Sequence, residues 1–289
     1  MPARVLVTGA HGQLGDAVVR AFADREVIAV GRAECDITDP AAVRRVVAAA
    51  HPAAIINCAA YNDVDGAEDA PAAAFAVNAF AVRSLARAAD GCGAALIHFG
   101  TDFVFFTGAD GRPLTEDTPP SPRSVYSASK LAGDWFALEA ARGFVLRVES
   151  LFGTPRGWQG RHGTLEKMVD ALEAGQAVRA FTDRIVSPSY VEDVAAATRH
   201  LLDGAVAPGL YHCVNSGYGS WHDVARETAR LLGADAPIVG VSVDDAPMKA
   251  PRPRFCALNN RKLAAAGFVM PPWQDALRRW VTTRGRPAD

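Results

Sequence analysis

Val5-Leu-Val-Thr-Gly9-Ala-His-Gly12-Gln-Leu-Gly15 is the stretch that decides the fold. A run of strand-forming residues meets three glycines and passes directly into residues 17–22, which have helical spacing. Such glycines permit positive φ and close approach of the backbone to a ligand, while the free N–H groups of a helix N-terminus attract an anion. The stretch therefore predicts a turn that binds the pyrophosphate of a dinucleotide. Because the first two glycines are one residue further apart than in the commonest fingerprint, an ordinary strand-to-helix turn remains the alternative.

Strand-like and helical segments alternate along the first half of the chain. This alternation predicts an α/β fold, a Rossmann-like doubly wound parallel sheet with helices on both faces and ligand at the carboxyl ends of the strands. The expected strands cover residues 26–30, 54–57, 94–99 and 144–148, and the expected helices about 40–50, 75–89 and 125–142.

The remainder mixes short strands and helices without that regular alternation. We expect residues 1–149 to form the dinucleotide-binding domain, with residues 183–215 returning to it. Residues 150–182 and 216–289 are then a smaller mixed α/β substrate-binding lobe. No low-complexity linker separates the parts, which favours one compact body.

Composition excludes several classes of function. The formal net charge is −2 over 289 residues and no basic face is apparent, which argues against nucleic acid as a partner. No apolar run approaches the roughly 20 residues that span a bilayer. The first strand starts too early for a signal peptide, so we expect no membrane association and a cytoplasmic protein. Five scattered cysteines and seven histidines without ligand spacing predict neither disulfides nor a metal site.

The sharpest chemical signal is Tyr126-Ser-Ala-Ser-Lys130, at the start of a predicted helix after a long loop. A separation of four residues places the phenol and the ammonium on one helix face. Since an unperturbed tyrosine has a pKa of about 10, we expect the neighbouring cation to lower the pKa of Tyr126 and make it a usable proton donor.

The glycine turn, Thr101 after a buried strand and the pair Tyr126 and Lys130 together resemble the extended short-chain dehydrogenase/reductase superfamily. Within it, the chain most resembles the dTDP-4-dehydrorhamnose reductase family over nearly its whole length. The matching blocks are Gly12 to Gly15, Ile56 to Tyr61, Gly100 to Phe105, Tyr126 to Gly133, Ser187-Pro188 and Trp273 to Leu277.

The resemblance implies reduction of a 4-keto group on a nucleotide-activated deoxysugar. Tyr126 would protonate the carbonyl oxygen, Lys130 would hold the nicotinamide ribose, and Thr101 would donate a hydrogen bond to the same oxygen. The other implied cofactor residues are Gly9, Gly12, Gln13, Leu14, Gly15, Asp36, Ile37, Ala59, Ala60, Tyr61 and Gly100. The expected substrate-binding residues are Thr101, Asp102, Ser150, Arg184 and Arg252, the two arginines being candidates for the substrate diphosphate or for a structural role.

The second strand ends in Val30-Gly31-Arg32, with no acidic residue to accept from a ribose 2′-OH. Arg32 suits a 2′-phosphate instead, which predicts that NADPH is used at least as well as NADH. An exposed arginine without a ligand is the alternative.

The chain also departs from the family pattern. Ser150 stands where the family commonly has tryptophan, and Phe106 where it commonly has aspartate, so the sugar can differ from the usual one. Ala17 replaces a glutamate that binds metal at the dimer contact of some relatives, which puts that contact in doubt and leaves a homodimer as an open expectation. Phe103 in place of a glutamate disfavours dehydration. Two other functions stay open: a nucleotide-sugar 4-epimerase and a non-catalytic NADP-binding regulatory subunit.

Overall fold

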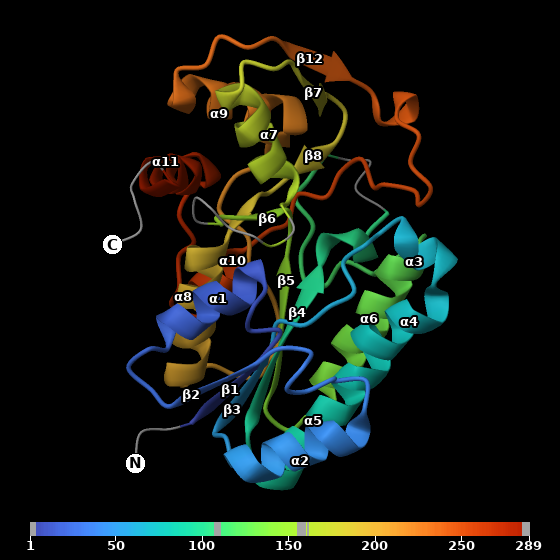
Figure 1. The fold of residues 1–289 in the computed structure, drawn as a ribbon, viewed down its shortest axis with the longest axis vertical. Helices are drawn as coiled ribbons and strands as arrows, with labels where there is room; N and C mark the ends of the chain where they lie inside the picture. The colour runs from blue at the N-terminus through green and yellow to red at the C-terminus, as the bar shows by residue number, and fades with distance from the viewer. Residues whose placement is uncertain (1–3, 107–110, 155–159, 161, 285–289) are drawn as a thin grey trace.

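A six-stranded sheet forms the centre of the molecule (Figure 1). The computed structural model describes residues 4–106, 111–154, 160 and 162–284. All strand pairs in this sheet are parallel, and the spatial order is β10-β5-β4-β3-β1-β2. The strands are β1 (Val5–Thr8), β2 (Val27–Val30), β3 (Ala54–Asn57), β4 (Ala95–Thr101), β5 (Gly143–Val148) and β10 (Gly209–His212).

Because β1 lies between β2 and β3, the chain leaves β1 first to one side and later to the other. In open α/β sheets, such a switch point marks the crevice in which ligands bind. The predicted fold class and strands are confirmed by this sheet. The strand β1 begins with an unbroken apolar run because both of its faces are buried: Val5 and Val7 face one hydrophobic core, and Leu6 faces the other.

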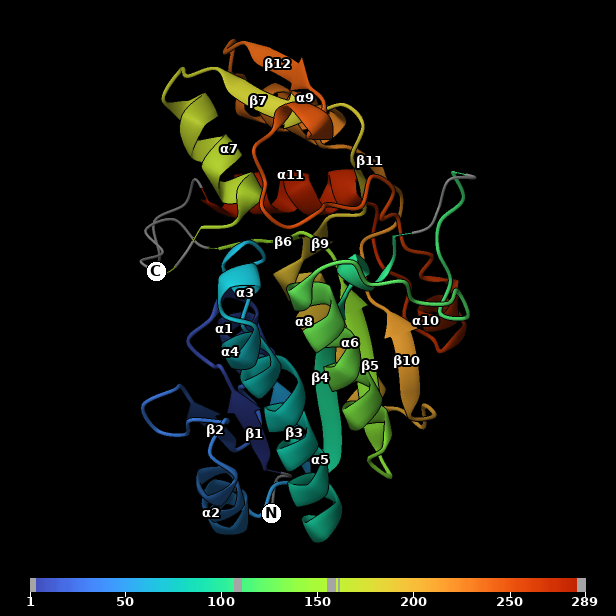
Figure 2. The same cartoon turned by 90° about the vertical axis from the view of Figure 1, so that its right-hand side faces the viewer.

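Helices cover both faces of the sheet, as the two views in Figure 1 and Figure 2 show. α1 (Gln13–Ala21) and α8 (Val191–Asp203) pack on the first face. α2 (Pro40–Ala50), α5 (Ala81–Cys92) and α6 (Val125–Leu138) cover the opposite face. Of the predicted helices, the one expected over 125–142 ends earlier, at Leu138, and the one expected over 75–89 is longer and interrupted.

That interruption is a π-helical turn. α4 (Pro71–Phe75) continues through η1 (Ala76–Phe80) into α5, so residues 71–92 are helical with one wide turn in the middle. Such turns are frequent at functional sites. Here the wide turn carries Asn78, whose side chain is buried.

A smaller lobe lies above the carboxyl ends of the strands (Figure 1). It contains α7 (Thr164–Glu173), α9 (Trp221–Leu232), α11 (Trp273–Arg284) and three two-stranded pairs. The pairs are β6 (Leu151–Phe152) with β9 (Ser189–Tyr190), β7 (Val178–Phe181) with β12 (Ile238–Val241), and β8 (Ile185–Val186) with β11 (Gly219–Ser220). The short elements are α3 (Gly66–Asp69), η2 (Asp102–Val104), η3 (Val243–Asp245) and α10 (Arg261–Ala265).

One hydrophobic cluster runs from the α1 and α8 face of the sheet into the lobe, from Val5 to Trp280. After the first lobe segment, the chain returns through α8 to β10 at the sheet edge. The division at residues 149/150, 182/183 and 215/216 stays a prediction, because a shared core provides no gap that would mark a boundary. Among the described residues, no helix is long and apolar enough to cross a bilayer.

Candidate active site

The glycine turn forms a cradle that only glycine can build. Gly9 has φ of +65°, and a Cβ there would lie 2.6 Å from the backbone nitrogen of Ala59. A Cβ on Gly15 would lie 2.2 Å from the carbonyl oxygen of Gly9. Gly12 precedes α1 and offers no side-chain cap, so no capping side chain accepts from the first N–H groups of α1. This N-terminus fits an anion such as a pyrophosphate.

Leu14 is buried beneath the turn, whereas the side chain of Gln13 points toward the lobe. Gln13 Nε2 donates to Glu166 Oε1 at 2.7 Å, and the same oxygen accepts from the N–H of Gly153 at 3.0 Å. Glu166 belongs to α7. The expected pyrophosphate residue Gln13 therefore also ties the glycine turn to the lobe through its side chain.

Ala59, Ala60 and Tyr61 follow β3 and are half-buried, as expected for residues beside the middle of a dinucleotide. Asn78 holds this segment in place: its Oδ1 accepts from the N–H of Tyr61 at 2.8 Å, and its Nδ2 donates to the Tyr61 carbonyl at 3.1 Å. The same amide donates to Ser129 Oγ at 3.0 Å. Asn78 therefore connects the segment after β3 to the helix that carries Tyr126.

The end of β2 differs from the sequence-based expectation. Arg32 has a side chain that is 91% exposed, with its Nε 3.6 Å from Asp36 Oδ2. Although no acid directly follows the strand, Glu34 turns back and accepts from the N–H of Gly31 at 2.8 Å. That hydrogen bond lowers the pKa of Glu34. The carboxylate of Glu34 therefore lies at the end of β2. This position was not predicted from the sequence, because Glu34 reaches Gly31 only through the turn that follows the strand.

Asp36 and Ile37 occupy the loop between β2 and α2. Ile37 is buried against the core, and Asp36 accepts from the Thr38 hydroxyl at 2.7 Å. Hydrogen bonds from Thr38 are the main reason that the pKa of Asp36 is lowered. The Asp36 carboxylate and the exposed guanidinium of Arg32 lie close together after β2, and their contact with an adenosine stays a prediction.

Tyr126 and Lys130 lie in the first two turns of α6, and Thr101 ends β4. Ser124 and Ser127 form a capping box that starts α6 at this point. All three predicted catalytic side chains are at most 8% exposed. The fold thus brings them together at the carboxyl edge of the sheet.

The expectation that the pKa of Tyr126 is lowered is wrong. Burial raises the pKa of Tyr126, and the lowering influence comes from the Thr101 hydroxyl rather than from Lys130. Lys130 Nζ donates to the carbonyl oxygen of Phe99 at 2.5 Å, and burial lowers the pKa of Lys130 to about 8 while the charge of Asp134 raises it. For both Tyr126 and Lys130, the free energy cost of removing the charged form from water outweighs the attraction between phenolate and ammonium that the helical spacing suggested.

Beneath these groups lies a buried ion pair. Arg147 Nε donates to Asp134 Oδ2 at 3.0 Å, with side chains 3% and 0% exposed. Gly100 leaves room for the pair, since a Cβ there would lie 2.6 Å from Asp134 Oδ1. The glycine expected to contact cofactor is thus also required by the packing beneath it.

Two of the predicted substrate residues, Arg184 and Arg252, meet at the ring of Phe103. This ring stands edge-on to Tyr126, with centroids 5.6 Å apart. The guanidinium groups of Arg184 and Arg252 lie 5.1 and 5.8 Å from its centroid. Arg252 also pairs with Asp65 at 2.8 Å, whereas Arg184 Nε is buried without a hydrogen-bond partner among the described residues. These contacts of Phe103 were not predicted from the sequence, because the residue lies in an apolar segment that resembles ordinary core sequence.

Asp102 and Ser150 complete this side. Asp102 is 2% exposed and its Oδ1 accepts from Thr101 Oγ1 at 3.0 Å. Ser150 has φ of +47°, a left-handed conformation that is uncommon outside glycine, at the point where the chain leaves β5 for the lobe. Its backbone carbonyl accepts from the N–H of Ser189 at 3.4 Å.

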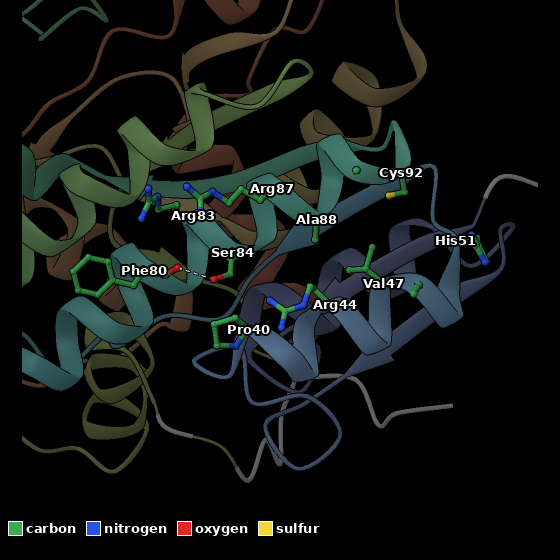
Figure 3. Close-up of a pocket in the computed structure, with 12 residues that line it drawn as sticks. Pro40, Arg44, Val47, His51, Phe80, Arg83, Ser84, Arg87, Ala88 and Cys92 are labelled. Carbon is green, nitrogen blue, oxygen red and sulfur yellow. Dashed lines mark hydrogen bonds between the residues drawn. The ribbon is translucent and has the colours of Figure 1, made fainter.

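A separate pocket of about 860 Å³ lies between α2 and α5 (Figure 3). Its walls include Arg44, Phe80, Arg83 and Arg87, and none of the predicted catalytic, cofactor or substrate residues. The chemistry described above is therefore elsewhere, at the carboxyl edge of the sheet.

Comparison with known proteins identifies the family to which this chain belongs. The profile of the RmlD substrate binding domain matches residues 3–285. The chain belongs to the RmlD substrate binding domain family. RmlD relatives include the dTDP-4-dehydrorhamnose reductase of Streptomyces griseus, 39% identical over 96% of this chain and 90% of that protein.

Solved structures agree with the RmlD assignment. The dTDP-4-dehydrorhamnose reductase of Bacillus anthracis, in complex with NADP, superposes with a TM-score of 0.91 at 30% identity, covering 98% of this chain and 99% of that one. A UDP-glucose 4-epimerase of Thermus thermophilus in complex with NAD reaches 0.82 at 22% identity, covering 98% and 100%. The second likeness shows a shared fold alone.

Proposed function

We propose that this chain is an NADPH-dependent reductase of a 4-keto group on a nucleotide-activated deoxysugar, acting as a dTDP-4-dehydrorhamnose reductase. The observation that carries the proposal is the meeting of two structures at one sheet edge. The glycine cradle after β1 fits a pyrophosphate, and the buried Tyr126, Lys130 and Thr101 lie at the carboxyl end of β4 and the start of α6, at the same edge of the sheet. Membership of the RmlD family supports the same activity.

The residues have distinct tasks in the proposed reaction. A bound reduced nicotinamide supplies the hydride. The Tyr126 hydroxyl gives its proton to the carbonyl oxygen of the sugar, and Thr101 donates a hydrogen bond to that oxygen as negative charge develops. Lys130 holds the nicotinamide ribose, exchanging its present bond to the Phe99 carbonyl for a ribose hydroxyl or using both. The Thr101 hydroxyl, whose hydrogen bond lowers the pKa of Tyr126, then favours the phenolate that Tyr126 leaves behind.

Of the two arginines, Arg184 is the better candidate for the substrate diphosphate. Arg252 already donates to Asp65 Oδ2 and to the carbonyl of Ala250, so a diphosphate would have to compete with both. Among the residues that the structure describes, none accepts a hydrogen bond from Arg184 Nε, although the guanidinium lies over the ring of Phe103. A guanidinium with a free donor beside the reacting group suits a phosphate oxygen.

The test mixes the protein with NADPH and a panel of 4-keto deoxysugar nucleotides, including the dTDP-linked substrate, while nicotinamide absorbance is followed. Loss of absorbance with the dTDP sugar, abolished by Tyr126→Phe and kept by the exposed Tyr218→Phe, is the expected result. Tight NADPH binding with no turnover across the panel would instead support the regulatory subunit. Tightly retained NAD with sugar isomerisation but no net cofactor change would support the 4-epimerase. The homodimer and the cytoplasmic location stay predictions.

A further inference from the structure

A group of titratable side chains lies behind Thr101 and has no part in the reaction proposed above. Asp102 begins η2, Glu149 follows β5, and Cys256 pairs through its backbone with Ile185 of β8. One oxygen of each carboxyl group and the sulfur of Cys256 lie within 4.8 Å of one another. Asp102 is 2% exposed, Glu149 1% and Cys256 0%, so water cannot hydrate these charges.

Each carboxyl group has one oxygen that is paired and one that is not. Glu149 Oε2 accepts from the N–H of Ser187 at 2.7 Å, and Asp102 Oδ1 accepts from the Thr101 hydroxyl. Asp102 Oδ2 and Glu149 Oε1 are buried without a hydrogen-bond partner among the described residues. The Cys256 thiol donates to the carbonyl of Pro253 at 3.5 Å. Buried acceptors of this kind are normally satisfied, and the weak S–H donor of Cys256, which also approaches the Asp102 carboxyl group, can satisfy at most one of these two oxygens, so the cluster lacks a donor.

A proton is the donor that fits. Two ionised carboxylates this close in a site without water repel each other strongly, and one shared proton removes the repulsion. We propose that Asp102 and Glu149 share one proton in the folded protein, so that the pair carries a single negative charge beside Arg184. In this arrangement Glu149 is a positioning residue, which acts on the reacting groups through Asp102 and Thr101.

The charges around the pair agree with this assignment. Arg184 faces both acids and balances the one remaining charge, and Cys256 is kept as a neutral thiol because burial raises its pKa. Burial raises the pKa of Asp102 to about 6. Burial also raises the pKa of Glu149, and the negative charge of Asp102 raises it further. The three side chains could instead ligate a metal ion, but the guanidinium of Arg184 disfavours a second cation at the same place.

The pair also bears on Tyr126. A negative charge on Asp102 raises the pKa of Tyr126, so a second charge on the pair would make the phenol a weaker proton donor. Keeping one proton on the pair limits that effect. This consequence rests on the proposed reductase function, whereas the shared proton itself does not.

Infrared spectroscopy of the full chain without substrate tests the shared proton directly, because a protonated carboxyl group has a C=O stretch that carboxylates lack. Spectra of the wild type minus Glu149→Gln, and of the wild type minus Asp102→Asn, are expected to show one lost acid band at neutral pH. Glu139→Gln, at an exposed position on the end of α6, is the control and should lose none. Two variants are used so that the test still stands if one of them folds poorly, which far-ultraviolet circular dichroism reports.

Absence of the acid band from both difference spectra would overturn the proposal. So would loss of the wild-type band on addition of stoichiometric Zn²⁺, which would make the cluster a metal site. A pH series separates this role from a purely structural one, because the band should disappear as pH rises in the wild type and, in the same way, in the Glu139→Gln control. Because the spectra use no substrate, a failure of the reductase assignment leaves their result unaffected.

Discussion

The two sides of the crevice are built on different physical principles. On the cofactor side, backbone touches backbone: Gly9 and Gly15 are required because a Cβ would overlap the main chain of Ala59 and Gly9. On the substrate side, Asp102, Glu149 and Tyr126 are titratable groups taken out of water, where partners and protons decide which forms exist. Changes to the first side should therefore act through shape, and changes to the second through charge and proton transfer.

The largest effect is expected on the substrate side. Tyr126→Phe removes the proton donor while leaving the glycine cradle unchanged, and it should lower kcat/KM by about 10²- to 10⁴-fold. NADPH affinity, measured by fluorescence titration, should change by no more than about twofold. A large loss of NADPH affinity would show that the two sides are not separable in this way. Tyr218→Phe, at an exposed tyrosine, is the matched control.

Substitutions on the cofactor side should destabilise the protein by steric overlap. Gly15→Ala places a Cβ 2.2 Å from the Gly9 carbonyl oxygen, and forcing this contact should lower the free energy of unfolding by about 2–3 kcal/mol. NADPH binding should weaken as the turn shifts. Gly91→Ala in α5, where a Cβ meets nothing within 4 Å, should raise stability by up to about 1 kcal/mol. Urea denaturation of both variants measures the difference, and equal stabilities would remove the steric argument.

The pH dependence of kcat/KM tests the role of the buried charge on Lys130. Burial lowers the pKa of Lys130 to about 8, so the ammonium is lost as pH rises through that value. If turnover needs the ammonium, kcat/KM should fall by about tenfold per pH unit above it. Lys130→Arg stays charged and should lose this limb of the profile, whatever its absolute rate. A profile with the same upper limb in both proteins would assign the titration to another group.

The smallest effect is expected at the exposed end of the cofactor side. Arg32→Ala should reduce the preference for NADPH over NADH by about three- to tenfold, since exposed charge interactions are weak. Glu34→Gln should shift the preference the other way, because its carboxylate lies beside Gly31 and repels a 2′-phosphate. Steady-state kinetics with both cofactors measures the ratio, with Arg87→Ala on α5 as control. An unchanged ratio in both variants would mean that neither side chain reaches the adenosine.

Local pattern was enough for the features that arise within one segment. The apolar strands, the glycine turn and the four-residue spacing of Tyr126 and Lys130 are set by steric demands and helical periodicity, so the sheet could be predicted from them. The meeting of Thr101 with Tyr126 was implied only by the family resemblance. The return of Glu34 onto Gly31 could not be predicted, because it depends on the path of a loop.

Only the tertiary structure decided the state of the buried groups. Burial, not the neighbouring ammonium, governs the pKa of Tyr126, and Glu149, Cys256 and Arg184 come from distant segments to meet Asp102. Hydration energy depends on every atom that excludes water from a group, wherever it lies in the chain. The sequence by itself therefore determined the scaffold and the choice of the residues proposed to react, while the folded protein determined which charges and protons they carry.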